Sequence, residues 1–371
     1  MTVTAWPLFM MLYPLLVSRR KCQPLCWVVF WVVMGGLLMG TGPADAAPKA
    51  PVAPTSAAQS VDPSSFVNVY TTEESPLWED LFKTFGEKTG IRIRYSVQDG
   101  ADIVKKLTED GDIPKADAVI IHGLPVLWQA GESGLLQKAP SLILESSIPP
   151  ALQGGAWFAF AQQAHVIVYD KTKYTTPPSG VSSYEALASP IYQSMICLSG
   201  ASVHQSWVAS MVQAHGEKKT LDWIKGLLGN VARPPAGGDG DQIKDLLAGR
   251  CALAVVGDDT VRRLPPEDQA KLDIIYPNAA DRGTHITITG AGVVKNAARR
   301  AEAIKLMEFL VSRPVQDRLA NEAKQYRAVN VMQIPNQKNP NPFGFRAEAL
   351  VQATLGPYSD QALILMDKAS W

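Results

Sequence analysis

Short apolar runs alternate with amphipathic segments along most of the chain. Residues 66–70, FVNVY, place apolar and polar side chains in alternation, which is typical of a β-strand. Ser75-Pro76 follows as a helix cap and a first-turn proline, and apolar residues then recur at four-residue spacing until Gly90. The pattern therefore predicts a strand followed by a helix.

The same alternation continues toward the C-terminus. Apolar runs bounded by turn residues predict further strands, and segments with helical spacing of apolar residues lie between them. Such alternation indicates parallel sheets covered by helices, which is the α/β class. Strands are expected at residues 91–97, 118–121, 157–160, 165–169, 195–198, 252–256, 274–276 and 285–288, and helices at 103–107, 124–130, 184–188, 206–215, 221–228, 242–248, 301–310, 314–323 and 347–355.

Length and composition narrow the class of protein further. A chain of 371 residues exceeds what one hydrophobic core usually organises, so we expect two lobes of roughly 100 to 150 residues each. Apolar residues make up 46% and charged residues 19%, as in folded globular proteins. The formal net charge is +0, and no basic stripe is interleaved with aromatic residues. Since phosphate recognition needs such a stripe, we expect no nucleic-acid partner.

The N-terminus has the features of an export signal. A basic triplet at residues 19–21 precedes an apolar run at 27–39 and the small-residue triplet at 44–46. We expect cleavage after Ala46, which makes residues 1–46 a signal peptide. Residues 47–65, rich in Pro, Ala and Ser, then form a flexible tether. The alternative is an uncleaved membrane anchor, because a second apolar stretch at 8–17 lengthens the region.

Removal of the signal leaves two of the four cysteines, Cys197 and Cys251. They stand in the apolar, strand-like runs MICLSG and CALAVVG, which would be neighbours in one sheet of an α/β lobe. Because disulfides persist in an oxidising compartment, we expect one bridge between them. The alternative is two reduced, buried thiols that behave as small hydrophobic side chains.

Several longer segments resemble the ferric-ion-binding proteins of bacterial ABC importers, which belong to the type II periplasmic binding protein superfamily. The resemblance covers nearly all of residues 66–371, and the run DRGTHITITGAGV is quite specific. Other segments that carry it are VNVYTTEESPLWEDLFKTFGEKTGI, ADAVIIHGLPVLWQAGESGLL, AHVIVYDK, HQSWVASMVQAHGE and AGRCALAVV.

The resemblance implies two α/β lobes joined by crossing strands, with a ligand cleft between them that closes by a hinge motion. We place the crossings near residues 165–169 and 276–281. Lobe one then comprises residues 66–164 and 282–371, and residues 165–281 form the hinge strands and lobe two. The resemblance also implies a periplasmic monomer that delivers a small ligand or metal to an ABC transporter permease in the inner membrane.

The tyrosines that bind iron in the resembling family are not retained. That family takes one ligand from a tyrosine just before the QSxVASM helix and two from adjacent tyrosines after a later strand. The matching positions here hold Val203, Asp259 and Thr260. Two arginines expected before the crossing strand are replaced by Gln163 and His165. We therefore expect a site without phenolate oxygens, which are the donors that suit Fe(III).

Carboxylates and one histidine replace the phenolic ligands, and this set should prefer a cation. Because oxygen and imidazole donors suit Mn(II), Fe(II) or Zn(II), Glu74, His204 and Asp259 are candidate ligands for a transported iron or other divalent ion. An organic cation or a hydrated ferric complex would also suit the set, and the bland alternative is that these are solvated loop and capping residues. The predicted ligand-binding residues are Glu73, Glu74, Ser75, Val203, His204, Asp258, Asp259 and Thr260.

Three other polar features are expected to stabilise the fold and not to bind ligand. Arg282 and His285, in the run DRGTH, are expected to brace the crossing region and not to touch ligand. The segment GGDGD at 237–241 lacks the spacing of a calcium loop, so we expect it to cap the following helix.

Two other functions compete with ligand delivery. A sensor subunit would bind its ligand in the same way but signal through a membrane partner. A thiaminase-like enzyme would use a cysteine of the cleft as its nucleophile, which needs a lowered thiol pKa and an adjacent base. Because Cys197 and Cys251 both lie in strand-like runs, we expect no enzyme.

Overall fold

The structure is a computed structural model that describes residues 65–328, 343–349 and 352–371. The predicted signal peptide and all but the last residue of the predicted tether lie outside these ranges. Within the described part of the chain, no helix is long and apolar enough to cross a membrane.

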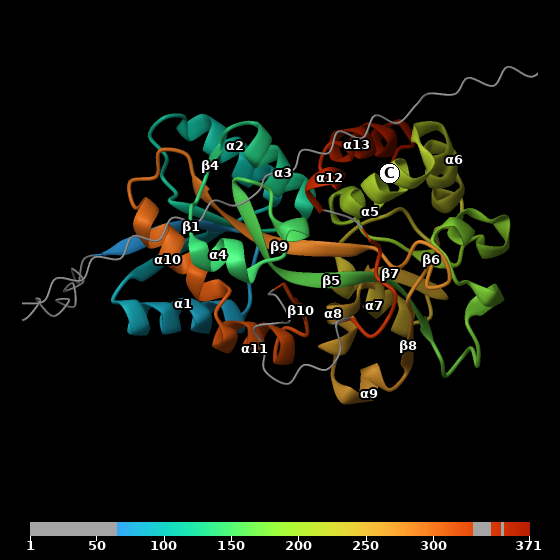
Figure 1. The fold of residues 1–371 in the computed structure, drawn as a ribbon. Helices are drawn as coiled ribbons and strands as arrows, with labels where there is room; N and C mark the ends of the chain where they lie inside the picture. The colour runs from blue at the N-terminus through green and yellow to red at the C-terminus, as the bar shows by residue number, and fades with distance from the viewer. Residues whose placement is uncertain (1–64, 329–342, 350–351) are drawn as a thin grey trace, which may run out of the picture. The chain divides into compact units, whose positions relative to one another are not determined.

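A 10-stranded sheet with the main order β2-β1-β3-β9-β5-β7-β6 forms the framework (Figure 1). The outer pairs β1–β2, β1–β3 and β6–β7 are parallel, as the alternating pattern predicts, but the central strands β9 and β5 run antiparallel to their neighbours. The strands are β1 (Phe66–Thr71), β2 (Arg92–Val97), β3 (Ala118–His122), β4 (Leu136–Gln137), β5 (Trp157–Asp170), β6 (Ile196–Cys197), β7 (Leu253–Gly257), β8 (Leu272–Ile275), β9 (Ile286–Val294) and β10 (Tyr326–Arg327).

The long strand β5 joins two parts of this sheet. Its first half pairs with β9 and β10, and its second half pairs with β7 and β8. All 14 of its residues are buried. The sequence predicts two separate strands here, because Gln162 and Gln163 interrupt the apolar pattern. Gln162 is accommodated inside the sheet because its Nε2 donates to the Arg327 carbonyl at 3.0 Å.

Helices pack around this sheet, and the first of them has clear start and stop signals in its sequence. Ser75 Oγ accepts from the Trp78 amide at 3.4 Å, Pro76 opens the helix, and Gly90 ends it in the left-handed conformation with φ 73°. The α-helices are α1 (Pro76–Thr89), α2 (Gly100–Asp110), α3 (Leu124–Glu132), α4 (Leu142–Ser147), α5 (Ala201–His215), α6 (Glu217–Leu228), α7 (Asp239–Leu247), α8 (Asp258–Arg262), α9 (Pro266–Gln269), α10 (Arg300–Leu310), α11 (Arg313–Asn321), α12 (Gln352–Leu355) and α13 (Tyr358–Lys368), and the 3-10 turns are η1 (Pro150–Leu152), η2 (Pro178–Gly180), η3 (Glu185–Ala188) and η4 (Pro190–Tyr192).

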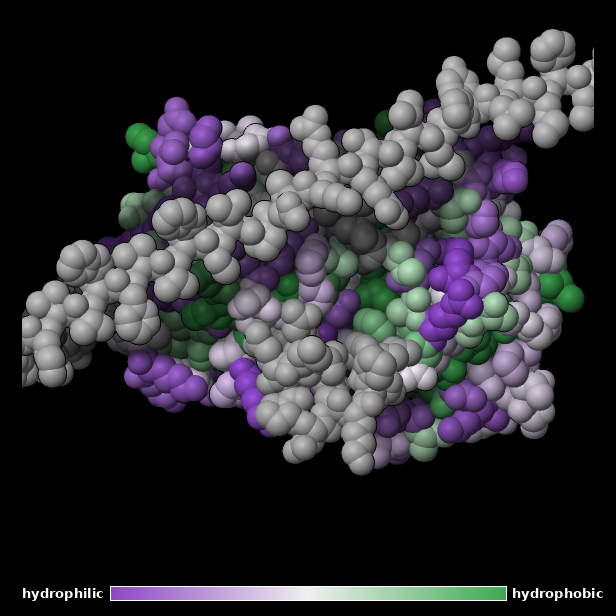
Figure 2. All heavy atoms as spheres, viewed as in Figure 1, coloured by the Kyte–Doolittle hydropathy of each residue, from purple (hydrophilic) through white to green (hydrophobic). Residues whose placement is uncertain are grey.

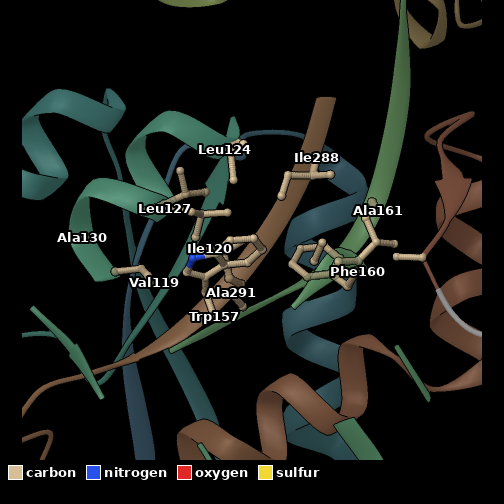
Figure 3. Close-up of a cluster of buried hydrophobic side chains, with 14 of the residues drawn as sticks. Val119, Ile120, Leu124, Leu127, Ala130, Trp157, Phe160, Ala161, Ile288 and Ala291 are labelled. Atoms are coloured by element: carbon tan, nitrogen blue, oxygen red, sulfur yellow. The ribbon is translucent and has the colours of Figure 1, made fainter. Parts of the chain in front are cut away.

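Part of the core lies between α3 and the central strands, where aliphatic side chains of β3 and β9 meet Trp157 and Phe160 of β5 (Figure 3). The approach is close at Gly290 of β9, since a Cβ there would lie 2.7 Å from Leu127 Cδ1 and 2.9 Å from the Phe158 carbonyl oxygen. A larger residue at position 290 would clash with the backbone of β5 and would displace the Leu127 side chain.

The outer surface is mostly hydrophilic on the face shown in Figure 2, with hydrophobic residues scattered between the polar ones. The large apolar side chains that are exposed include Ile113, Leu142 and Ile191, which come from different elements. Single exposed apolar residues of this kind are normal for a soluble surface.

The C-terminal region differs from the sequence prediction. A helix is expected at 347–355, but Ala347 forms a parallel bridge with Thr284, and the helix α12 is described from Gln352 to Leu355. The sequence prediction also missed α13, which packs against α5 and α6 (Figure 1). Its buried residues Ala362, Leu365 and Met366 recur at helical spacing in the sequence.

The predicted disulfide is confirmed. Cys197 at the end of β6 is bonded to Cys251, which lies two residues before β7, with the Cα atoms 5.7 Å apart. Because β6 pairs with β7 in parallel, the bridge crosslinks two neighbouring strands. Neither cysteine is a free thiol.

The predicted structural roles also agree with the observed contacts. Arg282 Nε lies 3.1 Å from Glu185 Oε1, and Arg282 also pairs with Glu348. His285 Nδ1 lies 2.9 Å from Glu348 Oε2. The GGDGD segment leads into α7, where Asp241 accepts from the Gly238 amide at 3.2 Å and caps the helix.

Candidate functional site

The loop from β1 to α1 turns one of its three predicted site residues inward. Glu73 Oε2 accepts a hydrogen bond from Trp78 Nε1 at 2.8 Å, and the Glu73 amide donates to Thr71 Oγ1 at 2.9 Å. Burial raises the pKa of the Glu73 carboxyl above its usual range. Glu74 is exposed, and Ser75 caps α1. Glu73 is therefore the acidic residue of this loop that faces the protein interior.

Three neighbouring strands bring polar side chains next to Glu73. Thr289 on β9 lies opposite His122 on β3 and Ala161 on β5, so Gln163, two residues beyond Ala161, faces the same side of the sheet. His122 Nδ1 lies 3.2 Å from Thr289 Oγ1 and 3.2 Å from Gln163 Nε2. Thr289 Oγ1 lies 3.5 Å from Glu73 Oε1.

Gln163 is incompletely satisfied. Its side chain is buried, with 7% relative exposure, and its Oε1 has no hydrogen-bond partner in the described part of the chain. A buried amide oxygen without a partner is unusual, because its desolvation is not compensated. This oxygen can accept from a molecule that enters the site.

Two further carboxylates come from the turn after β7 and the start of α7. Asp239 Oδ2 accepts from the Gly257 amide at 2.6 Å, and Asp259 Oδ2 pairs with Arg263 Nη2 at 3.0 Å. A Cβ on residue 257 would lie 2.6 Å from Asp259 Oδ1 and 3.3 Å from Asp239 Oδ2. Glycine at this position therefore leaves the space that these two carboxylates occupy.

Electrostatic interactions connect the two groups of residues. Burial is the main cause that raises the pKa of Glu73 and of Asp239. The charge of Asp259 raises the pKa of each carboxyl further, and His122 lowers it. Arg263 also lowers the pKa of Glu73. These residues form one electrostatic group, which we call the polar cluster: Glu73, His122, Gln163, Asp239, Asp259 and Arg263.

His204 lies in a buried aromatic region and both of its ring nitrogens are engaged within the protein. Its Nε2 accepts from the Ser199 amide at 3.2 Å, so the proton of the neutral ring is on Nδ1, which donates to His165 Nε2 at 2.9 Å. Burial lowers the pKa of His204 to about 3. Trp207 and Trp371 pack against its ring. Val203, the preceding residue, is partly exposed.

Asp258 also has a full set of protein partners. Its Oδ1 accepts from the Ala164 amide at 2.9 Å, its Oδ2 accepts from the Tyr326 hydroxyl at 2.6 Å, and Arg262 lies 2.8 Å away. Asp258 thus ties α8 to β5 and β10. The sequence predicts a loop at 258–260, but these residues form the first turn of α8, where carboxylates are favoured by the helix dipole. Thr260 is partly exposed.

The structure does not bring the three predicted metal ligands together. Glu74 is exposed, His204 is engaged in the core, and Asp259 belongs to the polar cluster. Across the described ranges, no group of three or more His, Cys, Asp and Glu side chains is placed to hold a metal ion. The carboxylates of the polar cluster come from three separate segments, which are the loop after β1, α7 and α8.

Four members of the polar cluster were not predicted as site residues, namely His122, Gln163, Asp239 and Arg263. His122 ends the strand ADAVIIH, and Asp239 was interpreted only as part of a helix cap. Gln163 was noted only as a replaced arginine. The position of His122 could have identified it. It lies at the carboxyl end of β3, which pairs in parallel with β1, and ligands bind at such strand ends in open α/β sheets.

Known proteins share this architecture. The chain matches the bacterial extracellular solute-binding protein family over residues 80–331. It is 33% identical to the iron uptake protein A1 of Synechocystis sp., over 92% of this chain and 95% of that protein. It is 24% identical to the major ferric iron-binding protein of Neisseria meningitidis, over 70% of this chain and 80% of that protein.

Solved structures give the same picture. The Trichodesmium protein FutA, in complex with iron and citrate, superposes with a TM-score of 0.71 and 33% identity, covering 83% of this chain and 100% of that one. The ferric binding protein of Campylobacter jejuni superposes with a TM-score of 0.76 and 28% identity, covering 82% and 99%.

The mixed α/β sheet, with polar side chains gathered beside its central strands, is the type II periplasmic binding protein fold. The chain belongs to the bacterial extracellular solute-binding protein family. The resemblance seen in the sequence is thereby confirmed.

Proposed function

We propose that this protein is the substrate-binding component of an ABC importer and captures a small positively charged ligand, or a metal complex, in the periplasm. The observation that carries the proposal is the polar cluster, which contains three carboxylates and one guanidinium group, with Asp259 paired to Arg263. The relatives named as iron uptake and ferric iron-binding proteins support a role in import.

The cargo is not a bare ferric ion held by phenolates. Val203, Asp259 and Thr260 occupy the positions where the family resemblance implies tyrosines. Tyr326 and Tyr276 are the phenols nearest to Asp258, and burial raises the pKa of both hydroxyls. Tyr326 already donates its hydroxyl to Asp258 and is therefore engaged within the protein.

We propose the two lobes predicted from the sequence. Lobe one comprises residues 66–164 and 282–371, and residues 165–281 form the hinge strands and lobe two. Glu73 and His122 then come from lobe one, and Asp239 and Asp259 come from lobe two. A ligand that contacts both pairs favours the closed form by its differential affinity for that form. Gln163 lies on β5 just before the proposed hinge strand, where it remains next to the site in either form.

Catalysis has little support. A thiaminase-like mechanism needs a cysteine nucleophile, and both cysteines of the described chain are oxidised to one disulfide. We therefore infer a binding protein, acting as a monomer with a permease of the inner membrane as partner. A sensor subunit that signals to a membrane protein is the second candidate, since it would use the same site.

A reconstituted importer tests the proposed function. A candidate ABC permease and ATPase from the same organism are placed in proteoliposomes, and ATP hydrolysis is measured with the protein purified from its own periplasm. We expect this protein to stimulate hydrolysis severalfold. No stimulation, with the protein instead binding a membrane receptor, would favour the sensor.

A further inference from the structure

We propose that the polar cluster binds an organic cation that carries N–H donors, an ammonium or guanidinium group, with Gln163 Oε1 as a neutral acceptor beside the carboxylates. This inference rests on the proposed function and names the chemical class of the cargo.

An excess of acceptors in the polar cluster is the first argument. Glu73, Asp239 and Asp259 contribute carboxylates, and Arg263, the cationic partner within the cluster, is already paired with Asp259 at 3.0 Å. The Asp259 charge also raises the pKa of the Glu73 and Asp239 carboxyls, so a positive charge beside Asp259 would favour the ionised form of both.

The unpartnered amide oxygen is the second and independent argument. Gln163 Nε2 contacts His122, whereas Oε1 on the same buried amide has no partner among the described residues. A neutral amide oxygen accepts an N–H donor, although more weakly than a carboxylate does. A site that recognised its ligand by charge alone would not need the neutral amide of Gln163.

In this conformation the described residues offer no preformed site for a bare metal ion. Metal ligands converge to distances of about 2.0–2.6 Å from one centre. No three carboxylate, imidazole or thiolate side chains of the described residues are placed to do so. Acceptors that come from separate segments suit a ligand whose N–H groups point in several directions, such as a planar guanidinium.

Calorimetry with matched ligands tests the inference. Putrescine and agmatine carry N–H donors, and the permethylated bis-quaternary analogue of putrescine has the same charge and chain but no N–H group. We expect putrescine and agmatine to bind at least tenfold more tightly than the bis-quaternary analogue. Equal affinities would show that N–H donors are not recognised and would overturn the inference.

Variants locate the binding. Gln163→Leu should weaken putrescine binding about tenfold, the loss expected for one hydrogen bond to a charged donor. Gln163→Glu should strengthen it, which a purely structural glutamine would not do. Glu87→Gln, an exposed carboxylate on α1, serves as the control and should change nothing.

Failure of the inference is distinguishable from failure of the proposed function. If Mn(II) or ferric citrate binds while all three organic cations fail, the cargo is a metal species and the inference is wrong, but the importer role stands. If the putrescine affinities are as expected but the loaded protein does not stimulate the importer, the binding chemistry stands and the importer role is wrong.

Discussion

At the scale of single residues, carboxylates that are equivalent in the sequence have different roles. Asp258 and Asp259 are adjacent, yet Asp258 is enclosed by Ala164, Tyr326 and Arg262, whereas Asp259 pairs with Arg263 and its charge raises the pKa of Glu73. The difference follows from the first turn of α8, because adjacent residues of a helix point in directions about 100° apart.

Loss of Asp258 should therefore cost stability and not only affinity. Asp258→Ala leaves Arg262 without its ion pair and Tyr326 without its acceptor, and removing one partner of a buried pair costs about 3–5 kcal/mol. Urea unfolding measures this loss. Asp268→Ala removes a partly exposed ion pair with Lys271 and is the control. A similar small loss in both variants would contradict the structural role of Asp258.

The absence of phenolate ligands gives a spectroscopic prediction. Ferric citrate added to the apo protein should produce no strong visible charge-transfer band, because Val203, Asp259 and Thr260 lack the phenol oxygen. The triple variant Val203→Tyr, Asp259→Tyr, Thr260→Tyr restores the phenols and should gain such a band. A band in the unsubstituted protein would mean that another tyrosine reaches the site.

The buried histidine pair gives a pH prediction. Burial lowers the pKa of His204 to about 3, and burial also lowers that of His165. Between about pH 6.5 and pH 3 the unfolded chain binds protons at these groups and the folded chain does not, so acidification favours unfolding. The free energy of unfolding of the wild type should fall more steeply over this window than that of His204→Gln. Equal slopes would show that His204 is protonated in the folded protein.

At the scale of elements, strand and helix periodicity predicted most of the fold, because apolar spacing reports which face of an element is buried. The antiparallel placement of β5 and β9 could not be read from the pattern, since a fully buried strand looks alike in either direction. The short helix α8 was also missed, because five residues carry too little periodicity.

The site was harder to predict than the fold, because its residues come together through contacts between segments that are distant in the sequence. The sequence predicted Glu73 and Asp259 as site residues, because each of them follows a predicted strand. His122, Gln163 and Asp239 meet only through the pairing of β3, β9 and β5 and the packing of α7, which are contacts between distant segments. His204 was predicted as a ligand because its hydrogen bond to His165 joins two segments that are distant in the sequence, and a local pattern does not reveal such a contact.

The bridge between β6 and β7 gives a prediction at this scale. Closing a loop with a sequence separation of 54 restricts the unfolded chain, so the double variant Cys197→Ala, Cys251→Ala should lose about 2–4 kcal/mol of unfolding free energy. Denaturant unfolding measures the loss. Thiol titration of the unfolded, unreduced mature protein should find no free thiol, and two reactive thiols would contradict the bond.

At the scale of the whole molecule, this chain shares its scaffold with iron uptake proteins. We propose that the site on this scaffold has different chemistry, because the resemblance implies tyrosines where Val203, Asp259 and Thr260 stand. Substitution within an unchanged fold is how one architecture serves different ligands.

Export is the first prediction for the whole chain. Cleavage after Ala46 should give a mature protein that begins at Ala47 and is recovered from the periplasm. Mass measurement of the purified protein decides this directly. An intact N-terminus in the membrane fraction would favour the anchor interpretation of residues 1–46.

The central claim is that the polar cluster holds a positively charged cargo. Native mass spectrometry with elemental analysis, applied to protein purified from its own periplasm, tests it most directly. We predict a bound small cation that is lost when Asp259 is replaced by Asn, with Glu87→Gln retaining it. A neutral or anionic ligand, or stoichiometric iron that persists in Asp259→Asn, would contradict the claim.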